Sequence, residues 1–144
     1  MSPRHVFVDT GAWFALQASD DSHHRVASET LQALMESSEA LLTSNLVVGE
    51  TYTLLRLSKG YRHAKRFLDI IARSDRLERV FVSENLDQHA YEILHLFSDH
   101  AFSYVDATSF ALMRLRGIRC AFAFDAHFAT AGFLRIPVDL PPSR

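Results

Sequence analysis

The sequence predicts an α/β fold built around a parallel β-sheet. Short apolar runs, typical of buried strands, alternate with longer segments whose apolar residues recur every three or four positions, which is typical of helices. With 144 residues and 48% apolar side chains, the chain suits a single compact domain, residues 1–144, and leaves no room for a second. It contains no internal repeat, low-complexity tract or linker.

The N-terminal part is expected to alternate strand and helix. His5–Val8 reads HVFV, a β-rich run that stops at Asp9, and a brief helix is expected over 12–16. Cap-type residues then precede a helix over 22–37, in which apolar side chains are spaced by three and four. The apolar run at 40–43 predicts a short buried strand.

Two helices and another strand follow. Ser44 and Asn45 can cap a helix that Gly60 ends, and its apolar stripe is expected to face the core. The members of this stripe are Leu46, Val47, Leu54 and Leu57. A further helix is expected over 61–72 and a strand over 77–82.

The C-terminal part continues the alternation. Ser83 caps a helix that runs to Phe97, and another helix is expected over 102–115, before Gly117. The run CAFAF at 120–124 predicts a buried strand. Residues 136–138 predict a last strand at an edge of the sheet, because a pair of prolines follows.

Charge and cysteine content narrow the functional classes. The net charge of -2 and the pI near 6.4 argue against a broadly basic surface, so any nucleic-acid contact must be local. Cys120 is the single cysteine, and we expect it to serve packing in a reducing compartment, the cytoplasm. We expect neither a leader nor a membrane span, because no segment has the required apolar pattern.

Two aspartates directly follow predicted strands. Asp9 comes after the first strand and Asp125 after CAFAF. The carboxyl ends of parallel strands are where α/β proteins usually bind ligands. Aspartate is also a preferred cap of a following helix, so each residue taken alone fits either role.

Two further acids lie on predicted helices beside apolar residues. Glu50 shares the face of Leu46 and Leu54. Asp106 lies one turn from Phe110. A carboxylate on a core-facing side needs a partner, which either a metal ion or an arginine can supply, and a rotated stripe would instead leave it at the surface.

Asp9, Glu50, Asp106 and Asp125, here called the acidic quartet, together favour a metal site. Like charges about 5 Å apart, at an effective dielectric near 20, repel by roughly 3 kcal/mol per pair, and a divalent cation removes that penalty. Oxygen ligands select Mg²⁺ or Mn²⁺, which can activate a water for phosphodiester hydrolysis. The sequence therefore predicts a metal-dependent nuclease in which the quartet is catalytic.

Four motifs carry a resemblance to a known family. They are VDT at 8–10, NLVVGET at 45–51, FSYVDATSFALM at 102–113 and FAFDAHF at 122–128. Over nearly the whole chain and in this order, they resemble the PIN-domain nucleases, in particular the VapC-type toxin ribonucleases. The resemblance implies an α/β/α sandwich with a parallel sheet, a Mg²⁺ or Mn²⁺ site and an RNA substrate.

The resemblance also implies roles for single residues. It assigns metal binding to the acidic quartet, the orientation of ligands or waters to the hydroxyls of Thr10 and Ser109, and core packing to Phe128 and Phe133. Ala123 departs from the pattern, because many relatives have a threonine there. The missing hydroxyl bears on the affinity for a second metal more than on the family assignment.

A toxin of this kind implies protein partners as well. A small antitoxin is expected to cover the active site, and a homodimer is expected because family members commonly pair. The RNA target, the number of metals and the choice between a toxin and a housekeeping ribonuclease stay open.

Five basic residues form a candidate RNA-binding surface. Arg56, Lys59, Arg62, Lys65 and Arg66 fall in one stretch without an acid and can contact phosphates, although a solvated helix face would have the same pattern.

The histidines do not match a zinc motif in their spacing. His127 lies in the DAHF turn, where contact with substrate and a role at a helix start are both open.

Two other functions remain as alternatives. An aspartyl-nucleophile phosphatase would also have an aspartate after its first strand, but Gly11 stands where that class carries a second aspartate. A non-enzymatic interaction module would use the acidic pocket to bind a partner's arginine or a structural ion. The intact acids at all four positions favour the nuclease.

Overall fold

Five parallel strands form the central sheet of the computed structural model, which describes residues 4–142. The strand order is β3-β2-β1-β4-β5, and every neighbouring pair is parallel. The strands are β1 His5–Val8, β2 Ala40–Ser44, β3 Leu77–Val80, β4 Cys120–Ala123 and β5 Leu134–Pro137. The predicted α/β fold with a parallel sheet is confirmed.

Within residues 4–142, seven helices connect and cover these strands. They are α1 Thr10–Gln17, α2 His24–Glu36, α3 Asn45–Ser58, α4 Tyr61–Arg73, α5 Glu84–Leu96, α6 Tyr104–Arg116 and α7 Ala126–Thr130. In that range, none of the helices is both long enough and apolar enough to span a lipid bilayer.

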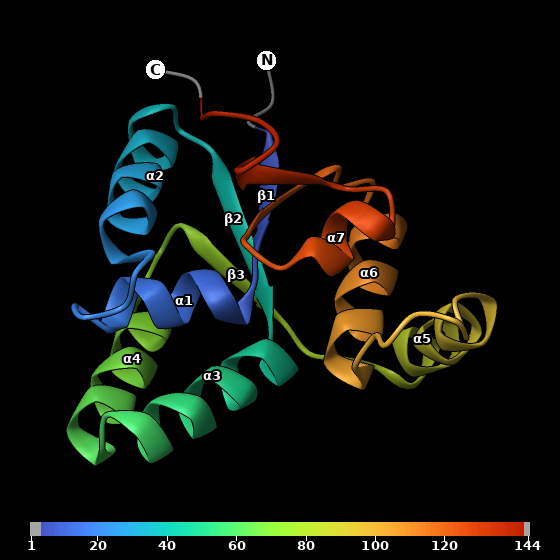
Figure 1. Ribbon diagram of the computed structural model, residues 1–144, viewed down its shortest axis with the longest axis horizontal. Helices are drawn as coiled ribbons and strands as arrows, with labels where there is room; N and C mark the ends of the chain where they lie inside the picture. The colour runs from blue at the N-terminus through green and yellow to red at the C-terminus, as the bar shows by residue number, and fades with distance from the viewer. Residues whose placement is uncertain (1–3, 143–144) are drawn as a thin grey trace.

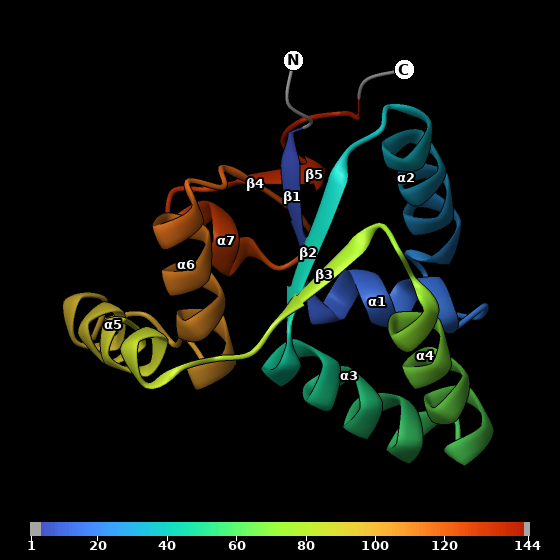
Figure 2. The ribbon, with the colours of Figure 1, turned by 180° about the vertical axis from the view of Figure 1, so that it is seen from behind.

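The helices divide into two layers around the sheet. Helices α1 to α4 lie on one face and α5 to α7 on the other, as the two opposite views show (Figures 1 and 2). From β1 the chain moves by way of β2 to β3, then returns to β4 and β5, so right-handed crossovers place the later helices on the opposite face. The implied α/β/α sandwich is confirmed, and its direction reverses between β1 and β4.

Local capping explains several helix boundaries. The Ser44 side chain accepts a hydrogen bond from the backbone N–H of Val47, and Ser83 accepts one from that of Leu86. Gly117 ends α6 in the left-handed conformation, with φ of 66°, which glycine adopts without Cβ strain. These caps agree with the predicted starts and stops.

Three details of the fold differ from the prediction. Strand β5 begins at Leu134 rather than 136, because it pairs with β4 from Cys120 onward. Strand β3 ends at Val80, since the N–H of Val82 donates instead to Asn45 Oδ1 at 2.8 Å. The bounds of helix α7 are not predicted from the sequence, although Asp125 is considered as its cap, because five residues are too few to establish a helical period.

Aromatic side chains fill much of the core. The fully buried phenylalanines are Phe7, Phe67, Phe110, Phe122 and Phe128. The Phe110 ring lies edge-on to Phe128, with centroids 4.9 Å apart, and 5.6 Å from Phe133. The packing roles of Phe128 and Phe133 are thereby confirmed, and Cys120 is also buried.

The apolar stripe predicted for α3 is confirmed at Val47 and wrong at Leu54 and Leu57. Its buried side chains are Val47, Val48, Thr51 and Leu55. Leu54 is 45% and Leu57 81% exposed. The helix is rotated from the predicted face because it packs on α1 and α4 as well as on the sheet. Glu50 therefore lies half-buried, at the edge of the packed face rather than in the core.

Candidate metal centre

The site lies at the carboxyl end of the sheet, where β1 and β4 are neighbours. Asp9 directly follows β1, and Asp125 lies two residues beyond β4. The backbone N–H of Asp9 donates to the Phe122 carbonyl oxygen at 3.1 Å, which ties the two strand ends together. Helices α1 and α7 leave these ends toward opposite faces, and ligands usually bind α/β sheets at such a reversal (Figure 1).

Asp9 is the buried centre of the quartet. Its side chain makes no capping hydrogen bond to α1, although it occupies the N-cap position, and the residue is only 6% exposed. Burial raises the pKa of Asp9 to about 7, against the effect of a hydrogen bond from the Thr10 backbone. The negative charges of Asp106, Glu50 and Asp125 raise the pKa of Asp9 further, so Asp9 lies within electrostatic range of the other three acids.

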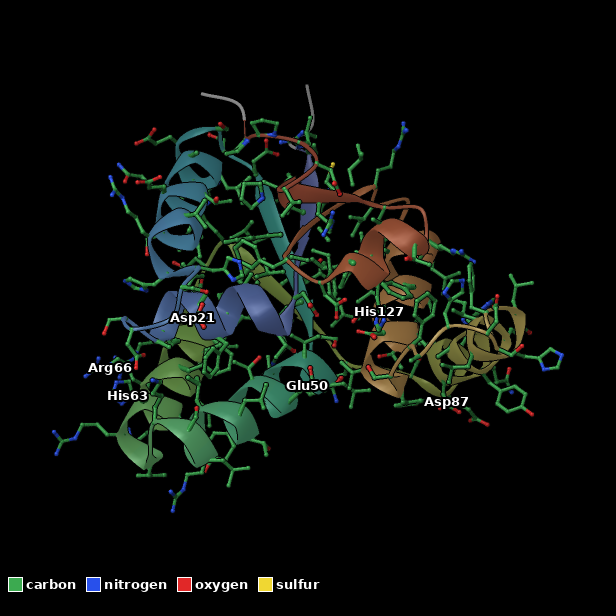
Figure 3. All side chains as sticks on the ribbon, in the orientation of Figure 1. Asp21, Glu50, His63, Arg66, Asp87 and His127 are labelled. Atoms are coloured by element: carbon green, nitrogen blue, oxygen red, sulfur yellow. The ribbon has the colours of Figure 1, made fainter. Side chains whose placement is uncertain are left out.

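Glu50 is held to the site by the first residue of α1. The Thr10 hydroxyl donates to Glu50 Oε1 at 2.6 Å, which links α1 to α3. In Figure 3 Glu50 points from the beginning of α3 into the space below α7, on the side where His127 lies. Thr10 is itself buried, so this bond holds the carboxylate in a defined position.

Asp106 has two partners. It closes a capping box at the start of α6, in which its carboxylate accepts the backbone N–H of Ser103 at 3.0 Å and the Ser103 hydroxyl accepts that of Asp106. The same carboxylate oxygen, Oδ2, lies 2.9 Å from His127 Nδ1. The carboxylate is therefore fixed by the helix cap and directed toward α7.

Asp125 and His127 complete the site from the turn after β4. Asp125 caps α7 by accepting the backbone N–H of His127 at 2.8 Å. The His127 ring then folds back, with Nδ1 3.6 Å from Asp125 Oδ1. The hydrogen bond with Asp106 raises the pKa of His127 above its usual value, and the two nearby carboxylates add to the effect.

These side chains suit a divalent cation. Asp106, Asp125 and His127 each offer a ligand atom, and these atoms lie within 4.8 Å of one another. Across residues 4–142, no lysine or arginine forms an ion pair with a member of the quartet, and His127 alone does so. A carboxylate cluster without a lysine or arginine partner offers oxygen donors of the kind that hard divalent cations prefer.

From the sequence, the role of His127 stays open between substrate contact and a helix start. The clearest signal in the sequence is the spacing of Asp125 and His127. An aspartate that caps a helix accepts the backbone N–H of the residue two positions later, and this places the His127 side chain close to the Asp125 carboxylate.

Comparison with known proteins gives the family. The PIN domain matches residues 6–134, a span that contains the whole quartet. The chain belongs to the PIN-domain family.

VapC20 proteins resemble this PIN domain in both sequence and structure. It is 38% identical over 135 residues to the 23S rRNA-specific endonuclease VapC20 of two Mycobacterium tuberculosis strains, CDC 1551 and H37Rv, covering 91% of this chain and 97% of the relative. The crystal structure of VapC20, a sarcin-ricin loop cleaving toxin, matches with a TM-score of 0.82 at 39% identity, over 91% of this chain and 98% of the other. The predicted likeness to VapC-type toxins is confirmed.

More distant structures share the fold alone. VapBC2 from Rickettsia felis, bound to a promoter DNA fragment, matches with a TM-score of 0.68 at 15% identity, over 91% of this chain and 96% of the other. FitAcB from Neisseria gonorrhoeae matches with a TM-score of 0.62 at 13% identity, over 90% and 94% of the two chains.

The two predicted hydroxyls differ in their surroundings in this PIN domain. Thr10 contacts Glu50, as described above. The Ser109 hydroxyl is fully buried and donates to the Val105 carbonyl oxygen of its own helix at 2.9 Å. Its role toward a metal stays a prediction.

The basic stretch of the PIN domain lies away from the quartet. Figure 3 places Arg66 on α4, far from Glu50 and His127. Lys59 pairs with Asp20 at 2.5 Å and Lys65 with Asp69 at 2.9 Å, so two acids from outside the stretch neutralise two of its five cations. Arg56 lies over the ring of Tyr61, and Arg62 is exposed.

Proposed function

We propose that this chain is a metal-dependent endoribonuclease and the toxin of a toxin–antitoxin pair. The observation that carries the proposal is a buried Asp9, after β1, whose pKa is raised by the charges of Glu50, Asp106 and Asp125 from α3, α6 and the turn after β4. In residues 4–142 none of the four has a lysine or arginine as an ion-pair partner. The identity to an rRNA endonuclease over 91% of the chain supports a ribonuclease with the same kind of site.

The metal is proposed to be Mg²⁺ or Mn²⁺. Asp9, Asp106 and Asp125 would hold it, with Glu50 reaching it directly or through water. When bound, such an ion supplies a water nucleophile and stabilises charge on the phosphate. The raised pKa of Asp9 supports this assignment, because a cation would stabilise a carboxylate that burial and its neighbours disfavour.

The chain's own residues orient the reacting groups. The Thr10 hydroxyl holds Glu50, and the helix caps at Ser103 and Asp125 hold the two outer carboxylates. His127 Nδ1 lies between Asp106 and Asp125, and the raised pKa of His127 favours the protonated ring there. A cation at these carboxylates would compete with that proton.

The substrate and partners follow from the family. We propose a structured RNA as substrate, of which ribosomal RNA is the first candidate because VapC20 is a 23S rRNA-specific endonuclease. A small antitoxin would cover the site, the chain would act as a homodimer, and the activity would be exercised in the cytoplasm, where such RNA is found. The Rickettsia felis complex supplies an example of the fold with a partner.

The test is RNA cleavage by the purified chain. We expect cleavage with Mg²⁺ or Mn²⁺, none after chelation, and poor replacement by Ca²⁺, which prefers more ligands and a looser geometry. Asp125→Asn is the matched inactive control, because asparagine can still cap α7. Full cleavage after exhaustive chelation would contradict the metal mechanism, and no cleavage with any metal would favour the interaction module.

A further inference from the structure

An apolar pocket of about 500 Å³ opens beside the metal centre, along α1. Its walls come from α1, the loop after it, α3 and the turn after β4. They are Thr10, Gly11, Phe14, Asp21, His23, Leu54, Leu57, Ser58 and Phe124. The volume lies within the range of about 300–1,000 Å³ in which proteins bind small ligands or parts of larger ones.

The pocket adjoins the acidic quartet through residues next to the quartet in the chain. Thr10, which lines it, also holds Glu50 through its hydroxyl. Gly11 and Phe124 line it as well, and each lies within two residues of a quartet aspartate in the chain. The pocket is therefore placed to receive a group that neighbours a phosphate at the quartet.

The lining matches a flat, partly polar ring. His23 and Phe124 stack with centroids 4.3 Å apart and planes at 11°, and the His23 side chain is 53% exposed, so a ring can stack on it or lie against Phe14. The Asp21 carboxylate accepts the backbone N–H of His23 with one oxygen, and carboxylates retain further acceptor sites for N–H groups of a ligand edge. Ser58 also lines the pocket, and its hydroxyl donates to the Leu54 carbonyl oxygen at 2.7 Å.

We propose that this pocket takes one unpaired nucleobase of the RNA substrate, next to the phosphate that is cleaved. The inference rests on the proposed ribonuclease function and assigns it a specificity element. Unstacked bases bind to proteins by stacking on aromatic rings and through hydrogen bonds to their edges, which are the two chemistries present here. An apolar protein segment would leave the acceptor at Asp21 unused, whereas the edge of a base can donate to it.

Gly11 offers a way to close the pocket without disturbing the fold. A Cβ placed on Gly11 would meet no other atom within 4 Å. The residue lies within α1 at an ordinary negative φ, and glycine is a poor helix former, so Gly11→Leu should leave stability unchanged or raised. Gln32→Leu, on the exposed side of α2, adds an apolar side chain outside the pocket and is the matched control.

The experiment compares the parent, Gly11→Leu and Gln32→Leu on an RNA that the parent cleaves with Mg²⁺. A series of the same RNA carries one abasic nucleotide at each position around the cleaved bond. In the parent we expect one abasic position to lower kcat/KM by roughly 10- to 100-fold, the usual effect of losing one stacked base. Gly11→Leu should show a comparable loss on the intact RNA and little further loss on that abasic RNA, while Gln32→Leu follows the parent.

The outcomes separate this inference from the proposed function. Equal melting temperatures and equal Mg²⁺ shifts for the three proteins would establish an intact fold and metal site. The base pocket would be overturned, and the ribonuclease function left in place, by either of two results. Gly11→Leu could cleave the intact RNA as fast as the parent does, or its loss of kcat/KM relative to the parent could be the same on intact and on abasic RNA. If the parent has the same kcat/KM on every abasic RNA, the base pocket is likewise overturned, and a protein segment becomes the occupant to test. A parent that cleaves no RNA would instead overturn the proposed function, and the base pocket with it.

Discussion

Replacing Asp9 by asparagine should make the metal-free protein more stable at neutral pH, although it removes a central residue of the site. Asparagine keeps the shape and an acceptor for the Thr10 backbone, but it carries no charge into a position that is 6% exposed. The parent carboxylate, by contrast, is disfavoured by burial and by three acidic neighbours.

The magnitude follows from the pKa of Asp9, which rises from 3.8 to about 7. At about 1.4 kcal/mol per unit, the charged form costs about 4 kcal/mol of folding free energy. Between these two values the folded state holds a proton that the unfolded state has released, so the parent loses stability as pH rises from about 4 to about 7 and stays low above that. The variant lacks this loss, because asparagine does not titrate.

Thermal melts without metal, at about pH 4 and about pH 8, test this reasoning. We expect nearly equal stabilities at the acid pH and a variant that melts roughly 10 °C higher at the alkaline pH. Mg²⁺ should stabilise the parent and have little effect on the variant, and RNA cleavage should be lost. Glu29→Gln, on the exposed surface of α2, is the control that removes a charge without changing the pH profile. A variant less stable than the parent at the alkaline pH, or a gain of the same size at both pH values, would refute the argument.

Three further changes test other parts of the site. Asp106→Asn keeps an acceptor for the α6 cap but removes a negative ligand, so cleavage should fall by about 100-fold or more in a multiple-turnover assay, and parental rates would exclude Asp106 from the site. Arg62→Glu combined with Arg66→Glu should lower the affinity for RNA and reduce the salt slope of binding by about 0.7 per lost phosphate contact. Lys65→Glu should have a smaller effect, because its cation is already paired with Asp69. Equal salt slopes for the variants and the parent would show that this surface is an ordinary solvated helix face. His127→Gln should flatten the pH dependence of Mg²⁺ binding, because parental affinity must rise as His127 loses its proton through its raised pKa; parallel titration curves for the two proteins would contradict this.

Much of the site could be predicted because its residues are marked by local pattern. Asp9 and Asp125 follow apolar strands, and parallel strands bring their carboxyl ends to one edge of a sheet. Asp106 could be placed on its helix by period alone. His127 could not be assigned with the same certainty, since its approach to Asp106 depends on α7, a helix too short to leave a period in the sequence.

The sequence by itself determined the order of strands and helices, the caps at Ser44 and Ser83, and the presence of an acidic quartet, because each of these depends on residues close together in the chain. Only the tertiary structure decided the rotation of α3, which exposes Leu57 at the pocket and leaves Glu50 at the edge of the packed face. It also decided that Lys59 is neutralised by an acid 39 positions away. The physical reason is the same in each case: packing and long-range pairing depend on which surfaces meet, and no periodicity within a single segment records that.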